Sequence, residues 1–469
     1  MSGTISSRPL PQGGGGRWGR SARALTSVAL LVLAGCAGYH PLPLARTADL
    51  KRNLASLDTI VPAGPGDPAQ PIAIDKPLTI NAIGLLAILN DPALKSEPGE
   101  KAVARSGLVQ ASLLPNPSAG LSYAALLGGP GTAPAYAASL SQDIASIITY
   151  RARVNAAKAH VAEVNADLLW REWQVAQKAR LLGLDIAEED RSIALATHER
   201  DLIAGEVAAV RKATAAGNLA LPALAPLLAA EASAEKTLAT LTLDREQNWQ
   251  GLDGLLRLLP DARFAIAPPS LPAPPPNVAR LIASLPARRP DLVALRLGYR
   301  VADENVRAAI LGQFPAFVLG GSWGSDTTGV VSAGPTVTFD LPIFDRNQGH
   351  VAATRATRLL LKEQYQSRLD QAVVAVRGLI AQARGLAVDL ARARRAADAA
   401  RTLAKTARSA YAQGNLDQRS LTDYETAALE RELTAVGIGR SLGEAEIAAT
   451  IELGLGLPQT TIAAQGRSP

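Results

Sequence analysis

Residues 365–411 read YQSRLDQAVVAVRGLIAQARGLAVDLARARRAADAARTLAKTARSAY, and their apolar residues recur at every seventh position in two columns. The first column is Leu369, Val376, Ala383, Leu390, Ala397, Ala404 and Tyr411, and the second is Tyr365, Ala372, Leu379, Leu386, Ala393, Ala400 and Ala407. A strict repeat of seven keeps an apolar seam against a neighbouring helix only when the helices supercoil left-handedly. At about 1.5 Å per residue this helix would be about 70 Å long. We therefore expect an extended coiled coil rather than a helix folded over one globular core.

The first half of the chain carries a less regular version of this repeat. Its columns are Val175, Leu182, Ala196, Ile203 and Val210, and Ala179, Ile186, Ile193 and Val207. Glu189 interrupts the first column and Arg200 interrupts the second. We predict a second long helix with an alanine-rich seam. Taken by itself, such a coiled coil has a purely structural interpretation.

Short motifs of the first half return in the second half in the same order and at a nearly constant separation. The pairs are NDPAL (90–94) with RRPDL (288–292), LLPNP (113–117) with QFPAF (313–317), GNL (217–219) with GNL (414–416), and LLRLLP (255–260) with LGLGLP (453–458). This pattern predicts a tandem duplication. The expected parts are a first repeat, a proline-rich connector, a second repeat and a tail, at 77–260, 261–277, 278–458 and 459–469.

Four short stretches alternate apolar and polar residues with a period of two, which is typical of half-buried strands. Their apolar sides are Leu121 and Tyr123; Tyr136, Ala138 and Leu140; Phe317, Leu319 and Trp323; and Val337, Phe339, Leu341 and Ile343. The fourth strand is expected over 336–343, and turn residues occur at 128–134 and 326–329. Each half is therefore predicted to contribute one β-hairpin.

The apolar face of these strands could meet a second sheet in a soluble sandwich, or lipid in a membrane barrel whose polar face lines water. The rest of the sequence offers no second sheet. Four strands cannot enclose a usable lumen, so the membrane interpretation requires several subunits. We therefore favour closure by an oligomer.

The N-terminus has the layout of a secretory signal. Residues 1–23 contain arginines and no acidic residue, and the apolar stretch 24–34 that follows is too short to span a bilayer. The sequence LAGC at 33–36 resembles a bacterial lipobox, which predicts that residues 1–35 form a cleaved signal peptide and that Cys36 is acylated. The alternative is an ordinary signal peptide with an incidental cysteine. Residues 36–76 are expected to form an extended lipidated segment.

Charge and composition exclude several classes of function. The whole chain has a net charge of +6, but the signal takes four arginines with it, so there is no argument for nucleic acid binding. The four histidines lack metal-ligand spacing, and no phosphate-binding or dinucleotide loop follows a strand. No carboxylate pairs with a plausible nucleophile. We expect no metal site, no cofactor and no enzymatic activity.

The duplicated layout and three motifs resemble the TolC-type outer-membrane efflux channels. The motifs are RRPDL (288–292), GPTVTFDLPIFDRNQG (334–349) and SAYAQGNLDQRSLTDYETA (409–427), and the resemblance spans residues 77–458. LPIFDRNQG, LLPNP and the lipobox together look closest to the lipoprotein branch of the family. The resemblance implies a mainly α-helical chain with a small β part. Three chains would form a twelve-stranded outer-membrane β-barrel, with four strands each, continued by a trimeric α-barrel tunnel of duplicated helical hairpins.

The resemblance also implies sites at the helix ends. The turns Gly217-Asn218-Leu219 and Gly414-Asn415-Leu416 would be the tips where a periplasmic adaptor docks, although each is equally well explained as a plain turn. At the periplasmic aperture the family pattern matches Tyr411, Gly414 and Asp423, but Ser420 stands where the family has a first aspartate. Asp417 and Arg419 lie near enough to substitute, and ion pairs between subunits could hold a constriction shut. Solvated charges at a helix end are the alternative.

The expected function is an exit duct of a tripartite efflux system. A lipid-anchored homotrimer in the outer membrane would conduct solutes passively when an adaptor and an inner-membrane pump open it. Ala37, after the cysteine, implies sorting to the outer membrane. The cargo would be selected by the pump, so metal cations, drugs, solvents and secreted polypeptides all fit. The alternative from another class is a non-conducting, lipid-anchored structural or adaptor-like coiled-coil protein of the envelope.

Overall fold

The structure is a computed structural model that describes residues 39–61, 70–270, 275, 277–315 and 317–455. The chain divides into two units, 1–49 and 50–469. The described residues of the first unit, 39–49, contain neither helix nor strand. The predicted signal peptide, Cys36 and the predicted tail lie outside the described residues.

Two very long helices run through the second unit. α4 (Ala145–Ala215) has 71 residues and α9 (Gln348–Ala412) has 65. In α9 the buried residues Val376, Leu390 and Ala397 all belong to one of the predicted heptad columns. The prediction of an extended helix with an apolar seam is confirmed, because the buried side of α9 is this seam and not a face folded over a globular core.

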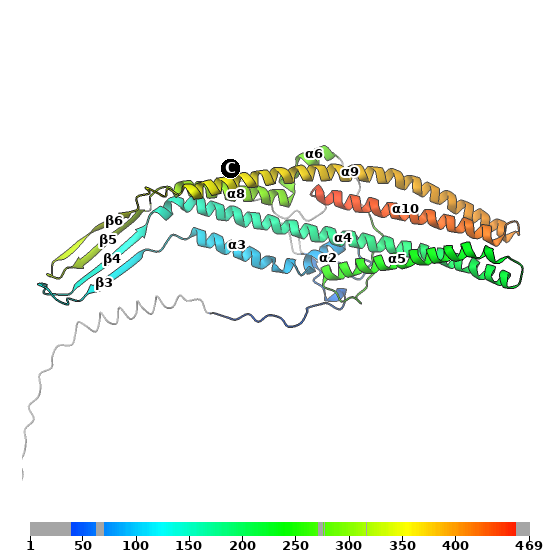
Figure 1. The fold of residues 1–469 in the computed structure, drawn as a ribbon, viewed down its shortest axis with the longest axis horizontal. Helices are drawn as coiled ribbons and strands as arrows, with labels where there is room; N and C mark the ends of the chain where they lie inside the picture. The colour runs from blue at the N-terminus through cyan, green and yellow to red at the C-terminus, as the bar shows by residue number, and fades with distance from the viewer. Residues whose placement is uncertain (1–38, 62–69, 271–274, 276, 316, 456–469) are drawn as a thin grey trace, which may run out of the picture. The chain divides into compact units, whose positions relative to one another are not determined.

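Each half of the chain has the same order of elements: a helix, a β-hairpin, a long helix and a helix that returns along it (Figure 1). The first half contains α3 (Glu97–Ser112), β3 (Ser118–Ala124), β4 (Ala135–Asp143), α4 and α5 (Ala225–Leu256). The second half contains α8 (Pro290–Leu311), β5 (Phe317–Ser325), β6 (Val331–Phe339), α9 and α10 (Gln418–Glu452). Shorter elements precede the halves: β1 (Ile60–Val61), β2 (Gln70–Pro71), α2 (Ile80–Asn90), α6 (Val278–Ala283) and α7 (Leu285–Arg288). The predicted duplication is consistent with this order.

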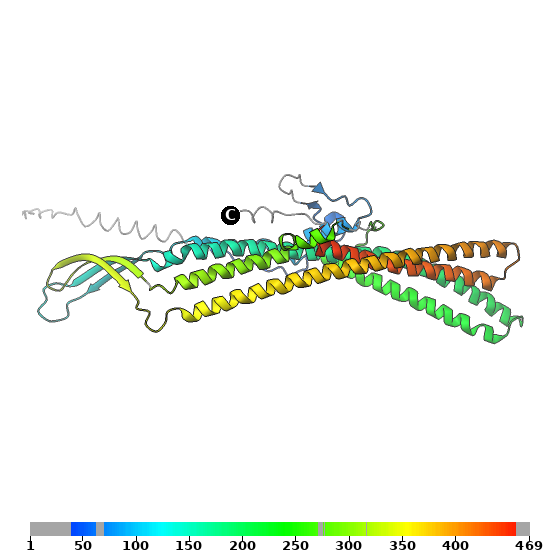
Figure 2. The same ribbon diagram turned by 90° about the horizontal axis from the view of Figure 1, so that it is seen from above.

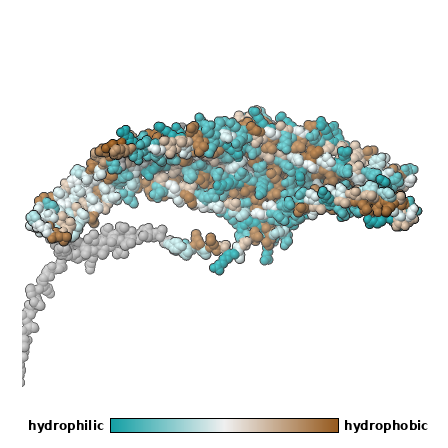
Figure 3. All heavy atoms as spheres, viewed as in Figure 1, coloured by the Kyte–Doolittle hydropathy of each residue, from teal (hydrophilic) through white to brown (hydrophobic). Residues whose placement is uncertain are grey.

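The four longer strands form one antiparallel sheet in the order β3-β4-β5-β6. Leu121 pairs with Ala138, and Ala138 pairs in turn with Trp323, so the predicted apolar residues share one face. Ser139 and Ser322 pair with each other on the opposite face. Both hairpins and their alternation are therefore confirmed. Figure 3 shows this end of the unit in pale colours of intermediate hydropathy, because its strands are rich in Gly, Ala, Ser and Thr.

The fourth strand ends earlier than the sequence predicted. It was expected over 336–343, but β6 spans Val331–Phe339, so it also begins five residues earlier, and the exposed Leu341 and Ile343 lie outside the sheet. β6 accommodates Pro335 within its ladder because it is an edge strand, so the ring of Pro342 alone does not end it. The Ile343 N–H instead donates to the Leu341 carbonyl at 2.8 Å, which turns the chain away from the sheet.

The helices of the second unit lie side by side in one layer (Figures 1 and 2). Near the sheet the packing order is α3, α4, α8 and α9, and toward the other end it is α5, α4, α10 and α9. Helix α9 therefore forms one edge of the layer over its whole length, while α3 and α5 form the other. The sheet continues both edges, because β6 leads into α9 and β3 follows α3.

The largest apolar cluster lies where α2 packs against α4 and α5. Its fully buried members include Ile83, Leu86, Ile186, Leu252 and Leu256. This cluster fixes the position of α5 along α4 in the middle of the unit. None of the helices in the described ranges combines the length and the apolar character that a membrane span needs.

Candidate functional site

Two turns of identical geometry end the long helices at the same end of the second unit (Figures 1 and 2). Gly217 and Gly414 adopt φ values of 77° and 75°, a left-handed conformation that favours glycine. The Asn218 N–H donates to the Ala213 carbonyl, and the Asn415 N–H donates to the Ala410 carbonyl, each at 2.9 Å. Together with the glycine bonds to residues three back, these form Schellman motifs. Both GNL motifs are therefore helix stops, and their role in docking stays a prediction.

The predicted aperture residue Asp417 has a structural duty at the second turn. It is the N-cap of α10, where its Oδ1 accepts the Ser420 backbone N–H at 2.8 Å and its Oδ2 accepts the Ser420 hydroxyl at 3.2 Å. The hydrogen bond from the Ser420 N–H holds the pKa of Asp417 below its ordinary value. Ser420, at the position where the family has a carboxylate, therefore donates two hydrogen bonds to the capping carboxylate of Asp417.

The remaining predicted aperture residues lie on both sides of this turn. Tyr411 occupies the last turn of α9 and is 42% exposed. Arg419 and Asp423 are exposed on the first two turns of α10. The structure therefore gathers Tyr411, Asp417, Arg419 and Asp423 at one helix junction. Their closing role stays a prediction.

Sequence reasoning missed Glu206, a carboxylate of α4 that faces this junction. Its side chain is buried, and its Oε1 has no hydrogen-bond partner among the described residues. Burial raises the pKa of Glu206 and the nearby Asp423 raises it further, whereas Arg419 and a hydrogen bond from Thr422 lower it. The one signal for Glu206 in the sequence is a charge directly before Val207, a residue of the heptad seam. Glu206 links α4 to the start of α10, so it couples the two helical hairpins at the tips.

A second buried carboxylate explains the break in the first heptad. Glu189, 2% exposed, accepts hydrogen bonds from the Asn248 amide at 2.9 and 3.0 Å and lies 3.3 Å from an Arg440 guanidinium nitrogen. These partners belong to α5 and α10. The charge in the seam is therefore a polar link that holds three helices at one level.

Next to this link, α4 and α10 bring two carboxyl groups together. Burial raises the pKa of Asp185 to about 7, and the hydrogen-bonded Glu444 contributes to the increase. Arg440 opposes the shift. Below about pH 7 Asp185 therefore keeps its proton, which relieves the repulsion between the two carboxyl groups.

The motif RRPDL at 288–292 builds a buried ionic centre in the middle of the unit. Arg289, 1% exposed, donates two hydrogen bonds to Asp291, at 3.0 and 2.7 Å, and also pairs with Glu452 of α10. Arg368 of α9 donates to the same Asp291 at 2.7 Å. The guanidinium of Arg289 lies 4.9 Å from the ring centroid of Trp170 in α4. The motif thus joins α4, α8, α9 and α10, which is a structural role.

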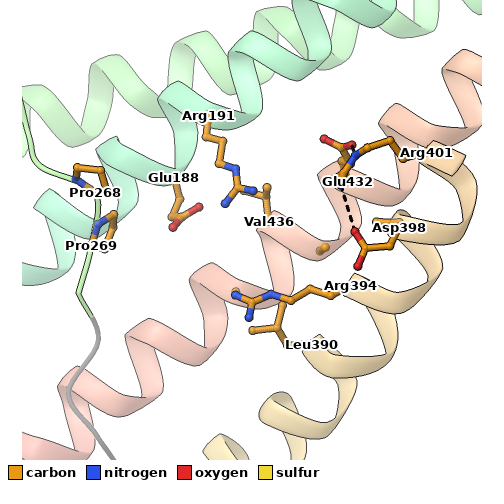
Figure 4. A pocket seen from close by; sticks show the side chains of 13 residues that line it. Glu188, Arg191, Pro268, Pro269, Leu390, Arg394, Asp398, Arg401, Glu432 and Val436 are labelled. Carbon is orange, nitrogen blue, oxygen red and sulfur yellow. Dashed lines mark hydrogen bonds and ion pairs between the residues drawn. The ribbon is translucent and has the colours of Figure 1, made fainter. Parts of the chain in front are cut away.

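A cavity of about 410 Å³ lies between the two helical hairpins, with Pro268 and Pro269 of the connector on one side of it (Figure 4). Arg401 pairs with Glu432 at 2.7 Å and with Asp398 at 3.1 Å on one side of it. Figure 4 shows the side chains of Arg191 and Arg394 extending toward it from α4 and α9. The cavity separates the two hairpins at a level farther from the GNL turns than the junction at Glu206. No group of three or more His, Cys, Asp or Glu in the described residues could hold a metal ion.

Comparison with known proteins agrees with this geometry. Residues 281–449 match the family model described as outer membrane efflux protein. No curated protein matches the chain in sequence. The matched segment runs from α6 to the last turns of α10 and includes the second GNL turn. The matched family is one of efflux proteins and not of enzymes.

Solved outer-membrane channels share the fold. The outer membrane protein VceC of Vibrio cholerae is 18% identical, with a TM-score of 0.65 over 80% of this chain and 96% of VceC. The CmeC outer membrane channel of Campylobacter jejuni is 16% identical, with a TM-score of 0.66 over 92% and 97%. The MtrE outer membrane channel of Neisseria gonorrhoeae in its open state is 18% identical, with a TM-score of 0.61 over 90% and 99%. The resemblance to TolC-type channels and the mainly α fold with a small antiparallel sheet are confirmed.

Proposed function

We propose that this chain is the exit duct of a tripartite efflux system, a homotrimer that conducts solutes passively from the periplasm across the outer membrane. The family match and the shared fold support an efflux-channel role. The observation that carries the finer proposal is the single layer of elements with two open edges. A single layer of this kind encloses no space until further copies close it.

The sheet supplies the outer-membrane part of this proposal. Asp143 is the only charged residue in its four strands. The apolar face exposes Leu121, Tyr123, Trp323 and Phe339, which would be costly in water but suits lipid. Three of the strands have nine residues, close to the length that a tilted membrane strand requires. Twelve strands from three copies would close the barrel, with β6 of each copy beside β3 of the next.

The helical part supplies the tunnel and its gate. Side-by-side helices from three copies would continue the barrel, and the GNL tips would form its periplasmic end. Asp417, Arg419 and Asp423 would line the aperture there, with Tyr411 at the turn before it. Glu206 would hold α10 against α4 in the closed state. An adaptor that binds the tips would separate the two hairpins at this junction and open the duct.

The membrane anchor belongs to the same proposal. The lipobox sequence supports acylation of Cys36 after removal of residues 1–35, and Ala37 supports sorting to the outer membrane. The alternative, a non-conducting structural or adaptor-like protein, lacks support from the family match and from the channel folds.

Conductance measurements test the proposal directly. Mature protein purified in detergent is inserted into planar lipid bilayers, alone and with its cognate adaptor and pump. We expect discrete channel openings that become larger or more frequent when the partners are present. A protein that never conducts, even with its partners, would favour the structural alternative.

A further inference from the structure

We propose that the seam between α4 and α10 is a proton-dependent latch between the two helical hairpins. Carboxyl groups of the two helices face each other there, Asp185 with Glu444 and Glu199 with Glu430, and we call these four residues the acid latch. Loss of their protons as the pH rises would push the hairpins apart. The inference rests on the proposed opening of the duct by separation of the hairpins. It adds a control of that opening by pH, at levels away from the aperture.

The register of α4 against α10 brings the latch residues together in pairs. Asp185 and Glu444 are hydrogen-bonded to each other. Glu199 lies fourteen residues after Asp185 on α4, and Glu430 lies fourteen residues before Glu444 on α10. Because helices in a coiled coil return to the same face after every seven residues, both pairs lie in one column of the seam between these antiparallel helices.

At the level of Asp185, three carboxyl groups share one cation. A guanidinium nitrogen of Arg440 lies 3.3 Å from Glu189, and another lies 3.5 Å from Glu444. The Oδ1 of Asp185 is buried and has no hydrogen-bond partner among the described residues. Two carboxyl groups can hydrogen-bond to each other only when one of them carries a proton. Burial raises the pKa of Asp185 to about 7, and Glu444 and Glu189 add to the increase, whereas Arg440 opposes it.

Charged side chains of the other helices at this level act on neighbours of the latch. Burial raises the pKa of Glu188, and Arg191 of α4 and Arg394 of α9 oppose that increase. Burial also raises the pKa of Glu189, and Asp244 of α5 adds to it. Among the described residues, Arg440 is therefore the one cation that opposes protonation of Asp185.

At the level of Glu199, no cation of the described chain offsets the paired carboxyl groups. Burial raises the pKa of Glu199, and the charge of Glu430 raises it further. The residues three and four positions away on both helices are uncharged. Arg200, the next residue along α4, pairs with Asp201 at 2.7 Å instead. Ionisation of both members of this pair therefore produces repulsion across the seam.

The seam is loosely packed between the two levels of the latch. The cavity of about 410 Å³ is lined there by Glu188 and Arg191 of α4 and by Val436 and Gly439 of α10. These residues lie between Asp185 and Glu199 on one helix and between Glu430 and Glu444 on the other. Because few apolar contacts cross the seam at the cavity, little is lost there when the hairpins separate, and repulsion at the latch can shift the balance.

The same column continues to the aperture. Seven residues beyond Glu199 stands Glu206, and seven residues before Glu430 stands Asp423. Burial raises the pKa of Glu206, and Asp423 raises it further. The acid latch is therefore aligned with the junction at which the hairpins would separate.

The direction of the pH response follows from these pKa shifts. When the helices separate, water reaches the carboxyl groups and their pKa values return to the ordinary range. The closed seam therefore binds more protons than the open seam, so a rising pH favours the open seam. For Asp185 this change falls between about pH 4 and about pH 7. Each proton released shifts the balance by up to about tenfold per pH unit.

Amide hydrogen exchange of α10 tests the latch without reference to transport. Detergent-extracted full-length protein is compared with the variant Asp185→Asn with Glu199→Gln, which keeps the shape of both side chains and removes their charge. Both substitutions are on α4, so the α10 peptides are identical and their intrinsic exchange rates cancel at each pH. We expect similar exchange at about pH 4.5, and at least about tenfold faster exchange in the unmodified protein at about pH 7.5.

Two further variants complete this test. Glu430→Gln with Glu444→Gln neutralises the latch from the α10 side, and peptides of α4 should show the same pH-dependent difference. The matched control, Asp190→Asn with Asp201→Asn, removes two exposed carboxylates of α4 that pair with arginines away from α10. Its α10 peptides should follow the unmodified protein at every pH.

Planar bilayers connect the latch to the channel and separate this inference from the proposed function. The unmodified channel should open more often as the pH rises from about 4.5 to about 7.5, and neutralising the latch should reduce this rise by about tenfold. A channel that conducts while the exchange difference stays constant with pH, or appears equally in the control, would overturn the latch and leave the duct standing. A pH-dependent exchange difference in a protein that never conducts would support the latch and contradict the duct.

Discussion

At the scale of single residues, Asp417 combines a capping role with a proposed gating role, and its two functions can be separated. Asp417→Asn keeps an oxygen that can accept the Ser420 N–H but removes the charge. Asp417→Ala removes both. We predict that only the alanine variant speeds amide hydrogen exchange in the first turn of α10. If the charge closes the aperture, both variants raise single-channel conductance by a similar factor. Equal exchange in the two variants would contradict the capping role, and unchanged conductance in both would contradict the gating role.

The buried ionic centre around Arg289 provides a second prediction at this scale. Asp291→Ala leaves the guanidinium of Arg289, 1% exposed, without its bidentate partner. Breaking a buried pair in this way costs about 3–5 kcal/mol, so the thermal midpoint should fall strongly. The control Asp389→Ala removes an exposed partner of Arg392 on the same helix and should change stability by less than about 1 kcal/mol. Similar thermal midpoints for the two variants would show that the centre is not structural.

Residues of this kind also mark the limit of prediction from the sequence. The GNL turns could be predicted because glycine followed by a polar residue ends a helix locally. Glu206, Glu189 and Arg289 could not be assigned roles in this way, because their partners Thr422, Arg440 and Glu452 lie on helices far away in the sequence. From the sequence alone, a charged residue within a heptad seam is interpreted as an interruption of the seam. Its role as a polar contact is visible only once its partner on another helix is known.

At the scale of elements, the helix stops can be tested through backbone strain. Gly414 has a φ of 75°, and no atom lies close enough to clash with an added Cβ. The cost of Gly414→Ala therefore comes only from the left-handed backbone conformation. We predict a loss of about 1–2 kcal/mol and faster exchange at the tip. Gly385→Ala, in the interior of α9 with equally open surroundings, should instead stabilise by up to about 1 kcal/mol. A stable Gly414→Ala variant with an unchanged tip would contradict the helix-stop assignment.

The contact between α4 and α10 predicts a dependence of stability on pH. The pKa of Asp185 in the folded chain is about 7, above the ordinary value of 3.8. Between these values the unfolded chain loses this proton while the folded chain keeps it, so this group lowers stability as the pH rises from about 4 to about 7. Above this range its contribution is constant.

Thermal unfolding at several pH values measures this contribution. Asp185→Asn should gain stability relative to the unmodified protein as the pH rises through that range. The control Asp201→Asn neutralises an exposed carboxylate on the same helix. Its stability should change with pH in the same way as that of the unmodified protein. A constant difference between Asp185→Asn and the unmodified protein from pH 4 to pH 8 would show that Asp185 does not hold a proton in the folded state.

The elements themselves were largely predictable. Helices and strands give sequence patterns with periods of seven and two among residues close together in the chain. These patterns therefore predicted α9, the seam of α4 and all four strands. The predicted end of β6 was wrong because the alternation continues through Leu341 and Ile343, whereas the backbone turns there through the hydrogen bond from the Ile343 N–H to the Leu341 carbonyl. The packing order of the helices and the two edges of the layer could not be predicted from the sequence. Several helices carry similar apolar seams, so the seams alone do not identify which helices pack together.

At the scale of the whole molecule, the central claim is that copies of one open layer close edge to edge into a conduit. The layer leaves β3, α3 and α5 open on one side and β6 and α9 open on the other. A single copy therefore encloses no lumen, and the exposed apolar face of its sheet has no partner within the described residues. Trimeric closure would satisfy both edges at once.

Native mass spectrometry of the mature, detergent-extracted protein tests this claim most directly, because it counts the chains in each particle. We predict one dominant species with three copies of the chain. A spectrum dominated by single chains, at concentrations where the fold is intact, would contradict the account.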